Sequence, residues 1–418
     1  MKNRVIIEKI VIAKNRIDYD YKVEGEWVKA FNLNEKFFVE YNLDLSLLPQ
    51  SMAIIPFLAN LLPMAWVYDA QIITPVCDKT FLDSIPDVKK GYKDMYPMME
   101  LKGELIVEKT EENHYTKDGG TGAFFSGGVD AFNTLVCHDD EKPTLITLWG
   151  ADIKLDDAMG WEKVLSHLIT TAEEFDTDFV TVKSNFRLFS NEGVLSNAVK
   201  NSGDGWWHGF HHGIGIISHG APIAYLKEKR ALYIASSFHI SQKGQYTCAS
   251  DPTIDNFIKF ADTKIVHDGY EQTRQDKIAN ITDFAKETGK KIPLRVCWES
   301  SGGGNCCKCE KCFRTIMGIY AQGFNPNEFG FDYTKEELKS LSKNMRYKNT
   351  FVRGALRYGP IQKAMQENLK KRQLPKEIRW FYSIIPSKIG KHPYLNFARK
   401  VKGKIKHILR RLVFNGKK

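Results

Sequence analysis

Residues 121–135, TGAFFSGGVDAFNTL, join an apolar run to a helical pattern through two adjacent glycines. The apolar residues at 123–125 predict the end of a buried strand, and helical spacing of apolar residues starts at Val129. Gly127 and Gly128 allow a turn that leaves backbone N–H groups at the positive end of a helix. Phosphate oxygens bind favourably at such a position, so we predict a phosphate site here. A tight connection without a ligand is the alternative.

The polar residues of this turn separate it from the two commonest phosphate loops. It has neither the lysine of the Walker pattern nor the three spaced glycines of the dinucleotide fingerprint. What remains is the order Ser-Gly-Gly-x-Asp, in which Ser126 would hydrogen-bond a phosphate oxygen and Asp130 would hold the loop or a Mg²⁺ ion. The next predicted strand ends at Trp149, which would either line the ligand crevice or belong to the core.

Four thiols form a second candidate site within residues 297–315, CWESSGGGNCCKCEKCFRT. Their spacing, C-x8-C-x2-C-x2-C, suits a closed, structural Zn²⁺ site made by Cys297, Cys306, Cys309 and Cys312. Buried free thiols and a redox Cys-x-x-Cys pair are the alternatives. Because the glycines and charges of this segment make a poor core, we predict zinc.

Histidines and two further cysteines complete the candidates. His208, His211 and His212 have a spacing that can share one helix face, which makes them candidates for substrate recognition or a second metal. Other residues follow predicted strands, or stand alone as candidate nucleophiles, and each is weak evidence by itself: His239, His267, Asp268, Arg274, Cys137 and Cys248.

An α/β fold would position these residues. From residue 119 onward, strand patterns alternate with helical patterns, the strands at 122–125, 143–149, 178–183 and 231–236. This rhythm predicts a doubly wound parallel sheet with its ligand crevice at the carboxyl ends of the strands. The expected domains are a β-rich domain at 1–115, an α/β ligand-binding domain at 116–330 that includes the knuckle at 297–312, and a helical region at 331–418. The most apolar stretch, 52–68, is expected to be a buried helix pair rather than a membrane span.

Composition and charge fit an ordinary soluble protein with a basic tail. Of 418 residues, 43% are apolar and 26% are charged, and the formal net charge is +10. Residues 366–418 alone hold 16 Lys and Arg against two acids, so the rest of the chain is mildly acidic. No secretory signal is evident and the cysteines are clustered, which together indicate a cytoplasmic protein.

Residues 398–414 predict a basic amphipathic helix. Such a helix could pack on the body of the protein, bind anionic lipid at the inner membrane surface, or bind nucleic acid. The aromatic residues 380–382 upstream favour the lipid interface over nucleic acid.

The Ser-Gly-Gly-x-Asp turn resembles the pyrophosphate loop of the PP-loop ATP pyrophosphatase superfamily, which has an adenine nucleotide alpha hydrolase-like fold. In that superfamily a serine ends the motif, and here Ala131 stands at that position. The resemblance implies ATP and Mg²⁺ as cofactors, with Ser126 and Asp130 as catalytic residues. It implies an ATP site made by Phe125, Ser126, Gly127, Gly128, Val129, Asp130 and Trp149.

The cysteine knuckle, followed by Arg314, narrows the resemblance to the 7-cyano-7-deazaguanine synthases over about residues 119–325. Those enzymes adenylate a carboxylic acid, amidate it and dehydrate the amide to a nitrile; their knuckle normally has glycine where this chain has Cys307. The chain is also similar to the ATP-dependent epimerase that inverts the glutamate of a UDP-muramoyl dipeptide.

Both relatives share one half-reaction. We therefore expect adenylation of a small or nucleotide-linked carboxylic acid with release of pyrophosphate, and leave the second half-reaction open. A catalytically weak ATP-binding module recruited by its basic tail, and a tRNA-modifying enzyme, are the alternatives.

Overall fold

The computed structural model describes residues 2–297, 303–348 and 354–390, and the part of the chain that it describes divides into two compact units. Of the described residues, 2–280 and 303 form one unit, and 281–297, 304–348 and 354–390 form the other. The tail helix predicted at 398–414 lies outside the described residues.

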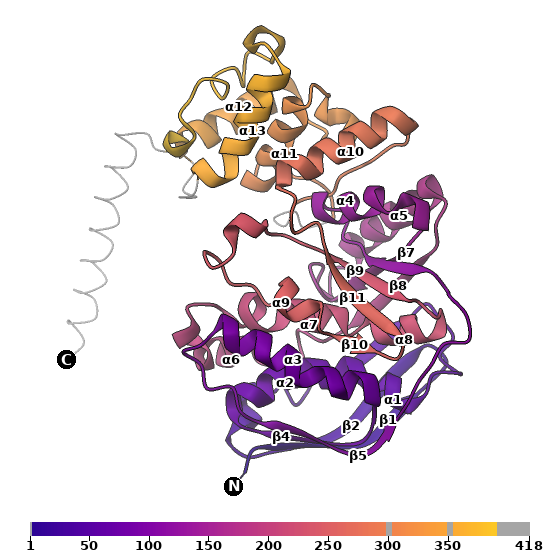
Figure 1. Ribbon diagram of the computed structural model, residues 1–418. Helices are drawn as coiled ribbons and strands as arrows, with labels where there is room; N and C mark the ends of the chain where they lie inside the picture. The colour runs from indigo at the N-terminus through magenta and orange to yellow at the C-terminus, as the bar shows by residue number, and fades with distance from the viewer. Residues whose placement is uncertain (1, 298–302, 349–353, 391–418) are drawn as a thin grey trace, which may run out of the picture. The chain divides into compact units, whose positions relative to one another are not determined.

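A single mixed sheet organises the first unit (Figure 1). Within the described residues it has eleven strands, which lie side by side in the order β10 (Lys259–Phe260), β11 (Thr263–Asp268), β9 (Ala231–Ala235), β6 (Thr121–Phe124), β7 (Thr144–Trp149), β8 (Phe179–Ser184), β3 (Phe38–Tyr41), β2 (Arg16–Glu24), β1 (Arg4–Ile12), β4 (Gln71–Asp78) and β5 (Glu104–Glu111).

The strands from β11 to β8 run parallel, and their order reverses at one point. The chain passes from β6 outward to β7 and β8, and then returns to the other side of β6 to add β9 and β11. In parallel sheets such a reversal opens a ligand crevice at the carboxyl ends of the two strands that flank it. Here these strands are β6 and β9. The predicted α/β class with a mostly parallel sheet is confirmed, and each strand predicted after residue 119 is present.

Strands before residue 115 continue the same sheet. β3 pairs antiparallel with β8, and β1, β2 and β3 form an antiparallel run. The boundary expected near residue 115 therefore lies inside the first unit. β4 and β5 were not predicted. Pro75 interrupts the pattern of β4, but β4 pairs with β1 only through residues 71–73, so the proline takes no hydrogen bond away from that neighbour.

Helices between the strands include α3 (Lys79–Met95), α4 (Val129–Cys137), α5 (Ala158–Phe175), α6 (Glu192–Ala198), α7 (His212–Ile217), α8 (Gly220–Leu226) and α9 (Pro252–Asp255), and α10 (Arg274–Thr288) follows the last strand, β11. A single π-helical turn, Trp207–His211, precedes α7. Phe132 of α4 contacts the Phe125 ring, whereas Gly220 of α8 faces Phe124, the neighbouring residue.

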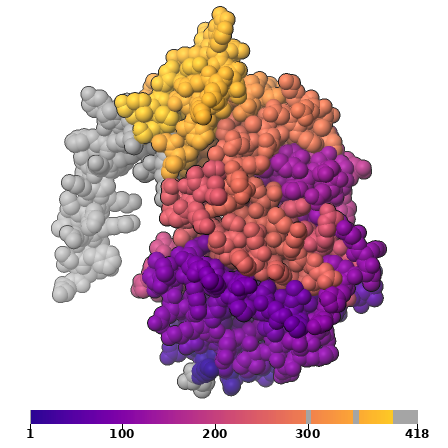
Figure 2. Space-filling view, in the orientation of Figure 1, coloured from indigo at the N-terminus to yellow at the C-terminus, as the bar shows by residue number. Residues whose placement is uncertain are grey.

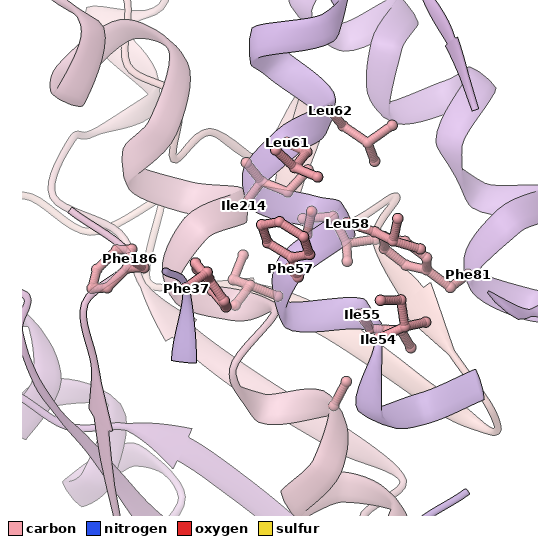
Figure 3. Close-up of a cluster of buried hydrophobic side chains, with 14 of the residues drawn as sticks. Phe37, Ile54, Ile55, Phe57, Leu58, Leu61, Leu62, Phe81, Phe186 and Ile214 are labelled. Carbon is pink, nitrogen blue, oxygen red and sulfur yellow. The ribbon is translucent and has the colours of Figure 1, made fainter. Parts of the chain in front are cut away.

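The apolar stretch at 52–68 forms α1 (Gln50–Ala53) and α2 (Ile55–Tyr68), and it is the buried helix pair that the sequence predicts. Figure 3 shows Phe57, Leu58, Leu61 and Leu62 of α2 directed into a cluster with apolar residues from distant parts of the first unit. None of the described helices is long and apolar enough to cross a membrane.

The second unit contains α11 (Glu310–Ala321), α12 (Lys335–Lys348) and α13 (Gly354–Asn368), coloured orange to yellow in Figure 2. Phe381 is fully buried and contacts Phe313 and Tyr358. Trp380 lies parallel to the Phe313 ring and donates its indole N–H to Ser342. These aromatic residues therefore belong to the packing of this unit, which removes the support that they gave to a lipid-binding helix.

Candidate functional site

The Ser-Gly-Gly turn lies at the carboxyl end of β6, beside the reversal of strand order. Gly127 has a φ of +74°, a left-handed conformation that favours glycine. Gly128 is the N-cap of α4, and its N–H points to the Ser126 hydroxyl at 3.4 Å. The Ser126 side chain is exposed, whereas Phe125 and Val129 are buried and could meet a ligand only through their backbone. The strand, the glycine turn and the start of the helix therefore follow one another as the sequence predicts.

Asp130 in the first turn of α4 is held by two cations from the start of α10. Arg274 Nη1 lies 3.0 Å and Lys277 Nζ 3.3 Å from its carboxylate oxygens. The Lys277 side chain is only 2% exposed, and its ammonium also donates to the backbone oxygen of Ser236, directly after β9. A buried ammonium needs such partners because desolvation of its charge is costly. The two cations therefore join the turn after β6 to the end of β9.

Sequence reasoning named Arg274 as a residue at a loop position but missed Lys277. The two lie three residues apart in the first turn of a helix, so they share one face. This i, i+3 spacing of two basic residues was the signal in the sequence that could have identified Lys277 as part of the site. The partnership with Asp130 spans well over a hundred residues of sequence and is visible only in the structure. Ala131, at the position of the superfamily's last serine, is 5% exposed.

Trp149 ends β7 and belongs to a small aromatic cluster. Its ring is parallel to that of Trp161, with centroids 5.2 Å apart, and the Lys183 ammonium lies 5.0 Å from its centre. The indole N–H donates to Lys154 O at 2.8 Å. Trp149 is half-buried, so it is packed on one side and retains exposed surface.

His138 joins the end of α4 to β11 and β9. Its Nε2 lies 3.1 Å from Asp268 and its Nδ1 3.2 Å from Glu141, and its ring stacks on Tyr233 at 4.1 Å. Hydrogen bonding to Asp268 is the main cause of a raised pKa for His138. Asp268 also accepts a hydrogen bond from Thr134 at 2.6 Å, and its pKa is lowered despite its burial. This network ties α4, and with it the turn, to the neighbouring strands.

Replacing His138 with glutamine is expected to destabilise the protein more at pH 5.5 than at pH 8.5. A raised pKa means that imidazolium adds stability that is fully present below about pH 6.5 and is lost as the pH rises through the folded-state pKa. The lowered pKa values of Asp268 and Glu141 contribute stability at both pH values, because that contribution is lost only below about pH 4. We expect a difference of about 1 kcal/mol between the two pH values, measured by urea unfolding. An equal loss at both would contradict this assignment.

The histidines of residues 207–219 occupy different environments. His211 is buried with its Nε2 against Asn60, and burial lowers its pKa to about 3. His212 lies 3.9 Å from the Cys248 thiol, and burial lowers its pKa to about 4. His208 is half exposed and hydrogen-bonded to Asp204. A shared metal does not fit: within the described residues, the cysteine group described below is the only set whose ligand atoms are close enough.

The remaining candidates are dispersed around the ends of the strands. His267 is buried, and its Nδ1 lies 2.8 Å from a carboxylate oxygen of Asp255. His239 caps a short turn after β9, with its Nδ1 2.7 Å from Ser241. Cys137 is exposed, whereas burial raises the pKa of Cys248 to about 12, so its thiol is neutral and poorly nucleophilic.

The cysteines that the sequence selects as metal ligands do come together, in the second unit. The Sγ atoms of Cys297, Cys306, Cys309 and Cys312 all lie within 4.8 Å of one another. Cys297 and Cys309 are 3.8 Å apart, and Cys306 and Cys312 are 3.9 Å apart. Sulfurs at 2.3 Å from a tetrahedral Zn²⁺ lie about 3.8 Å from each other, so this group could hold a single ion such as zinc.

Backbone geometry preorganises this cysteine group. Cys309 is the N-cap of α11, and its sulfur accepts from the Cys312 N–H at 3.4 Å. Cys306 accepts from the Lys308 N–H at the same distance. Hydrogen bonding from the Cys312 side chain lowers the pKa of Cys309 to about 5. A thiolate is therefore available at this position for a metal.

Cys307 is not part of the group. It has a φ of +49°, the left-handed conformation in which glycine is favoured, and its buried thiol has a pKa raised to about 12. Glu310, next in the chain to Cys309, is buried and accepts hydrogen bonds from Arg357 and Tyr358 at 3.1 and 3.0 Å. These contacts fix the first turn of α11, which carries two of the four sulfurs.

Comparisons with known proteins give no relative: no family model, no curated protein and no solved structure matches the chain.

Proposed function

We propose that the protein is an ATP-dependent enzyme that adenylates a carboxylic acid and releases pyrophosphate. One observation carries the proposal: the glycine turn at the end of β6 and two cations from α10 meet around Asp130, beside the reversal of strand order. Backbone N–H groups and paired cations are the donors that a diphosphate needs. A doubly wound sheet with helices on both faces is the matching fold, and the contacts of α4 with Phe125, directly after β6, and of α8 with Phe124, the last residue of β6, support it.

In the proposed reaction, a substrate carboxylate oxygen attacks the α-phosphorus of ATP and the bond to the β-phosphate oxygen breaks. The products are the acyl adenylate and pyrophosphate. Ser126 and the N–H groups of Gly127 and Gly128 would hold the β- and γ-phosphates, and Trp149 would flank the adenine. Mg²⁺ would neutralise charge on the phosphates when bound.

Arg274 and Lys277 would stabilise the departing pyrophosphate. Both cations contact the single carboxylate of Asp130. A guanidinium and an ammonium carry more N–H donors than one carboxylate accepts, so they could also donate to a diphosphate, and charge-assisted hydrogen bonds to phosphate are strong. Donors already fixed in place cost little reorganisation when charge develops on the leaving group. Asp130 therefore holds the cations in position rather than serving only as a Mg²⁺ ligand.

The cysteine group would hold Zn²⁺ in a structural role. With four sulfur ligands the ion has no open position for water or substrate, so it would stabilise the fold of the second unit rather than activate a nucleophile. We place the enzyme in the cytoplasm, with a peripheral membrane contact of 398–414 as the remaining option. The second half-reaction could be amidation, as in 7-cyano-7-deazaguanine synthases, or epimerisation, as in the UDP-muramoyl-dipeptide epimerase.

Pyrophosphate–ATP exchange tests the proposal. The full-length protein, Mg²⁺, ATP and labelled pyrophosphate are incubated with the deproteinised small-molecule fraction of a cell extract as the source of acids. We expect label to enter ATP only when that fraction is present. The alternative supported by Ala131, a catalytically weak ATP-binding module, predicts ATP binding without exchange.

A further inference from the structure

We propose that His208 is the proton acceptor of the second half-reaction, in which a nucleophile consumes the acyl adenylate, and that Asp204 positions it. This inference rests on the proposed function. Within the described residues, His208 is the only histidine of the π-helical segment, residues 207–211, that is both exposed and hydrogen-bonded to a carboxylate. Short π-helical turns occur frequently at functional sites.

The Asp204 carboxylate fixes the tautomer of His208. Asp204 Oδ1 lies 3.1 Å from His208 Nδ1, and its other oxygen accepts from Tyr96 at 2.9 Å and from Thr247. A carboxylate can only accept from Nδ1–H, so neutral His208 carries its proton on Nδ1 and its lone pair on Nε2. Nε2 makes no hydrogen bond within the residues that the structure describes. An imidazole held in this way is the usual arrangement of a general base.

His208 contacts the loop that follows β9, and this loop also contacts the proposed diphosphate site. The His208 side chain is 48% exposed, and its ring meets Phe238 edge to face with centroids 6.2 Å apart. Phe238 lies in the loop after β9, and its backbone oxygen accepts from the Ser236 hydroxyl at 2.7 Å. The Ser236 backbone oxygen in turn accepts from Lys277, which pairs with Asp130. His208 is thus connected to the proposed diphosphate site through a single loop.

The proposed step is the transfer of the acyl group from AMP to an amine. An amine nitrogen attacks the acyl carbon of the adenylate, the bond from that carbon to the AMP oxygen breaks, and AMP leaves with the electron pair. The N–H proton of the nucleophile passes to His208 Nε2. General base assistance of this kind typically contributes about 10²- to 10⁴-fold in rate.

The test compares the full-length protein with His208→Gln, using the same acid fraction as the exchange assay. Ammonium chloride and hydroxylamine are the two nucleophile probes. Hydroxylamine is unprotonated and strongly nucleophilic at neutral pH, so it traps the adenylate as a hydroxamate without a base. We expect hydroxamate formation and pyrophosphate exchange within about twofold of wild type, and ammonium-dependent AMP release lowered about 100-fold.

His114→Gln is the matched control, because His114 is also an exposed histidine paired with an aspartate, Asp262, at 3.0 Å. It should retain wild-type rates with both nucleophiles. Added imidazole should restore part of the AMP release in His208→Ala, which a purely structural role of His208 would not allow. Unchanged AMP release in His208→Gln, or an equal loss with both nucleophiles, would overturn the inference. If wild type forms no hydroxamate and no labelled ATP, the proposed function itself fails.

Discussion

Replacing Cys312 with serine is expected to remove the metal and destabilise the second unit. Cys312 is fully buried, and its sulfur lies 3.9 Å from that of Cys306, so the change removes one of the four sulfur ligands from the group. Structural zinc sites supply apparent binding free energies of about 10–16 kcal/mol, which count as folding energy. We expect wild type to contain one zinc ion per chain, and Cys312→Ser to retain less than about a tenth of it and to melt at least 10 °C lower. Elemental analysis and thermal unfolding measure these effects.

Cys307→Gly is the control for this experiment, since Cys307 lies in the same segment outside the cysteine group. Its left-handed backbone accepts glycine without strain, so zinc content should be unchanged. Loss of zinc from Cys307→Gly, or full zinc retention in Cys312→Ser, would contradict the assignment of the ligands.

Replacing Lys277 with methionine is expected to lower pyrophosphate release about 10²- to 10³-fold, the usual effect of removing one preorganised donor. Methionine is close to the lysine stem in size, and it avoids leaving a buried charge at a position that is 2% exposed. Asp130 keeps its contact with Arg274, so the turn should retain its shape. The measurement is the rate of pyrophosphate formation with saturating ATP and the acid fraction.

Lys286→Met serves as the matched control, because Lys286 is an exposed lysine of the same helix, α10. It should react at the wild-type rate. Circular dichroism and thermal unfolding should show that Lys277→Met is folded. A folded Lys277→Met protein with a wild-type rate would remove the cation pair from the mechanism.

Local sequence patterns were sufficient for the features that depend on near neighbours. Strand and helix periodicity located β6, β7, β8 and β9, and the glycine turn between β6 and α4 was predicted from two residues that allow its backbone. The spacing of the cysteines predicted a group that the structure brings within 4.8 Å. In each case the chemistry is encoded within about twenty residues.

Features that depend on distant parts of the chain were not predictable in the same way. The pairing of β3 with β8 joins residues that are more than 140 positions apart, so the continuity of the sheet has no local signature. The same holds for Lys277 and Asp130. The π-helical turn at 207–211 changed the environment of the histidines, because one extra residue per turn shifts which side chains share a face.

The central claim is that the turn at 126–130 binds the diphosphate of a nucleotide, and a crystal structure with a non-hydrolysable ATP analogue tests it most directly. We predict that the β- and γ-phosphates contact the N–H groups of Gly127 and Gly128, and that Arg274 and Lys277 donate to phosphate oxygens from the positions in which Asp130 holds them. An analogue bound elsewhere, with no phosphate at the turn, would contradict the account.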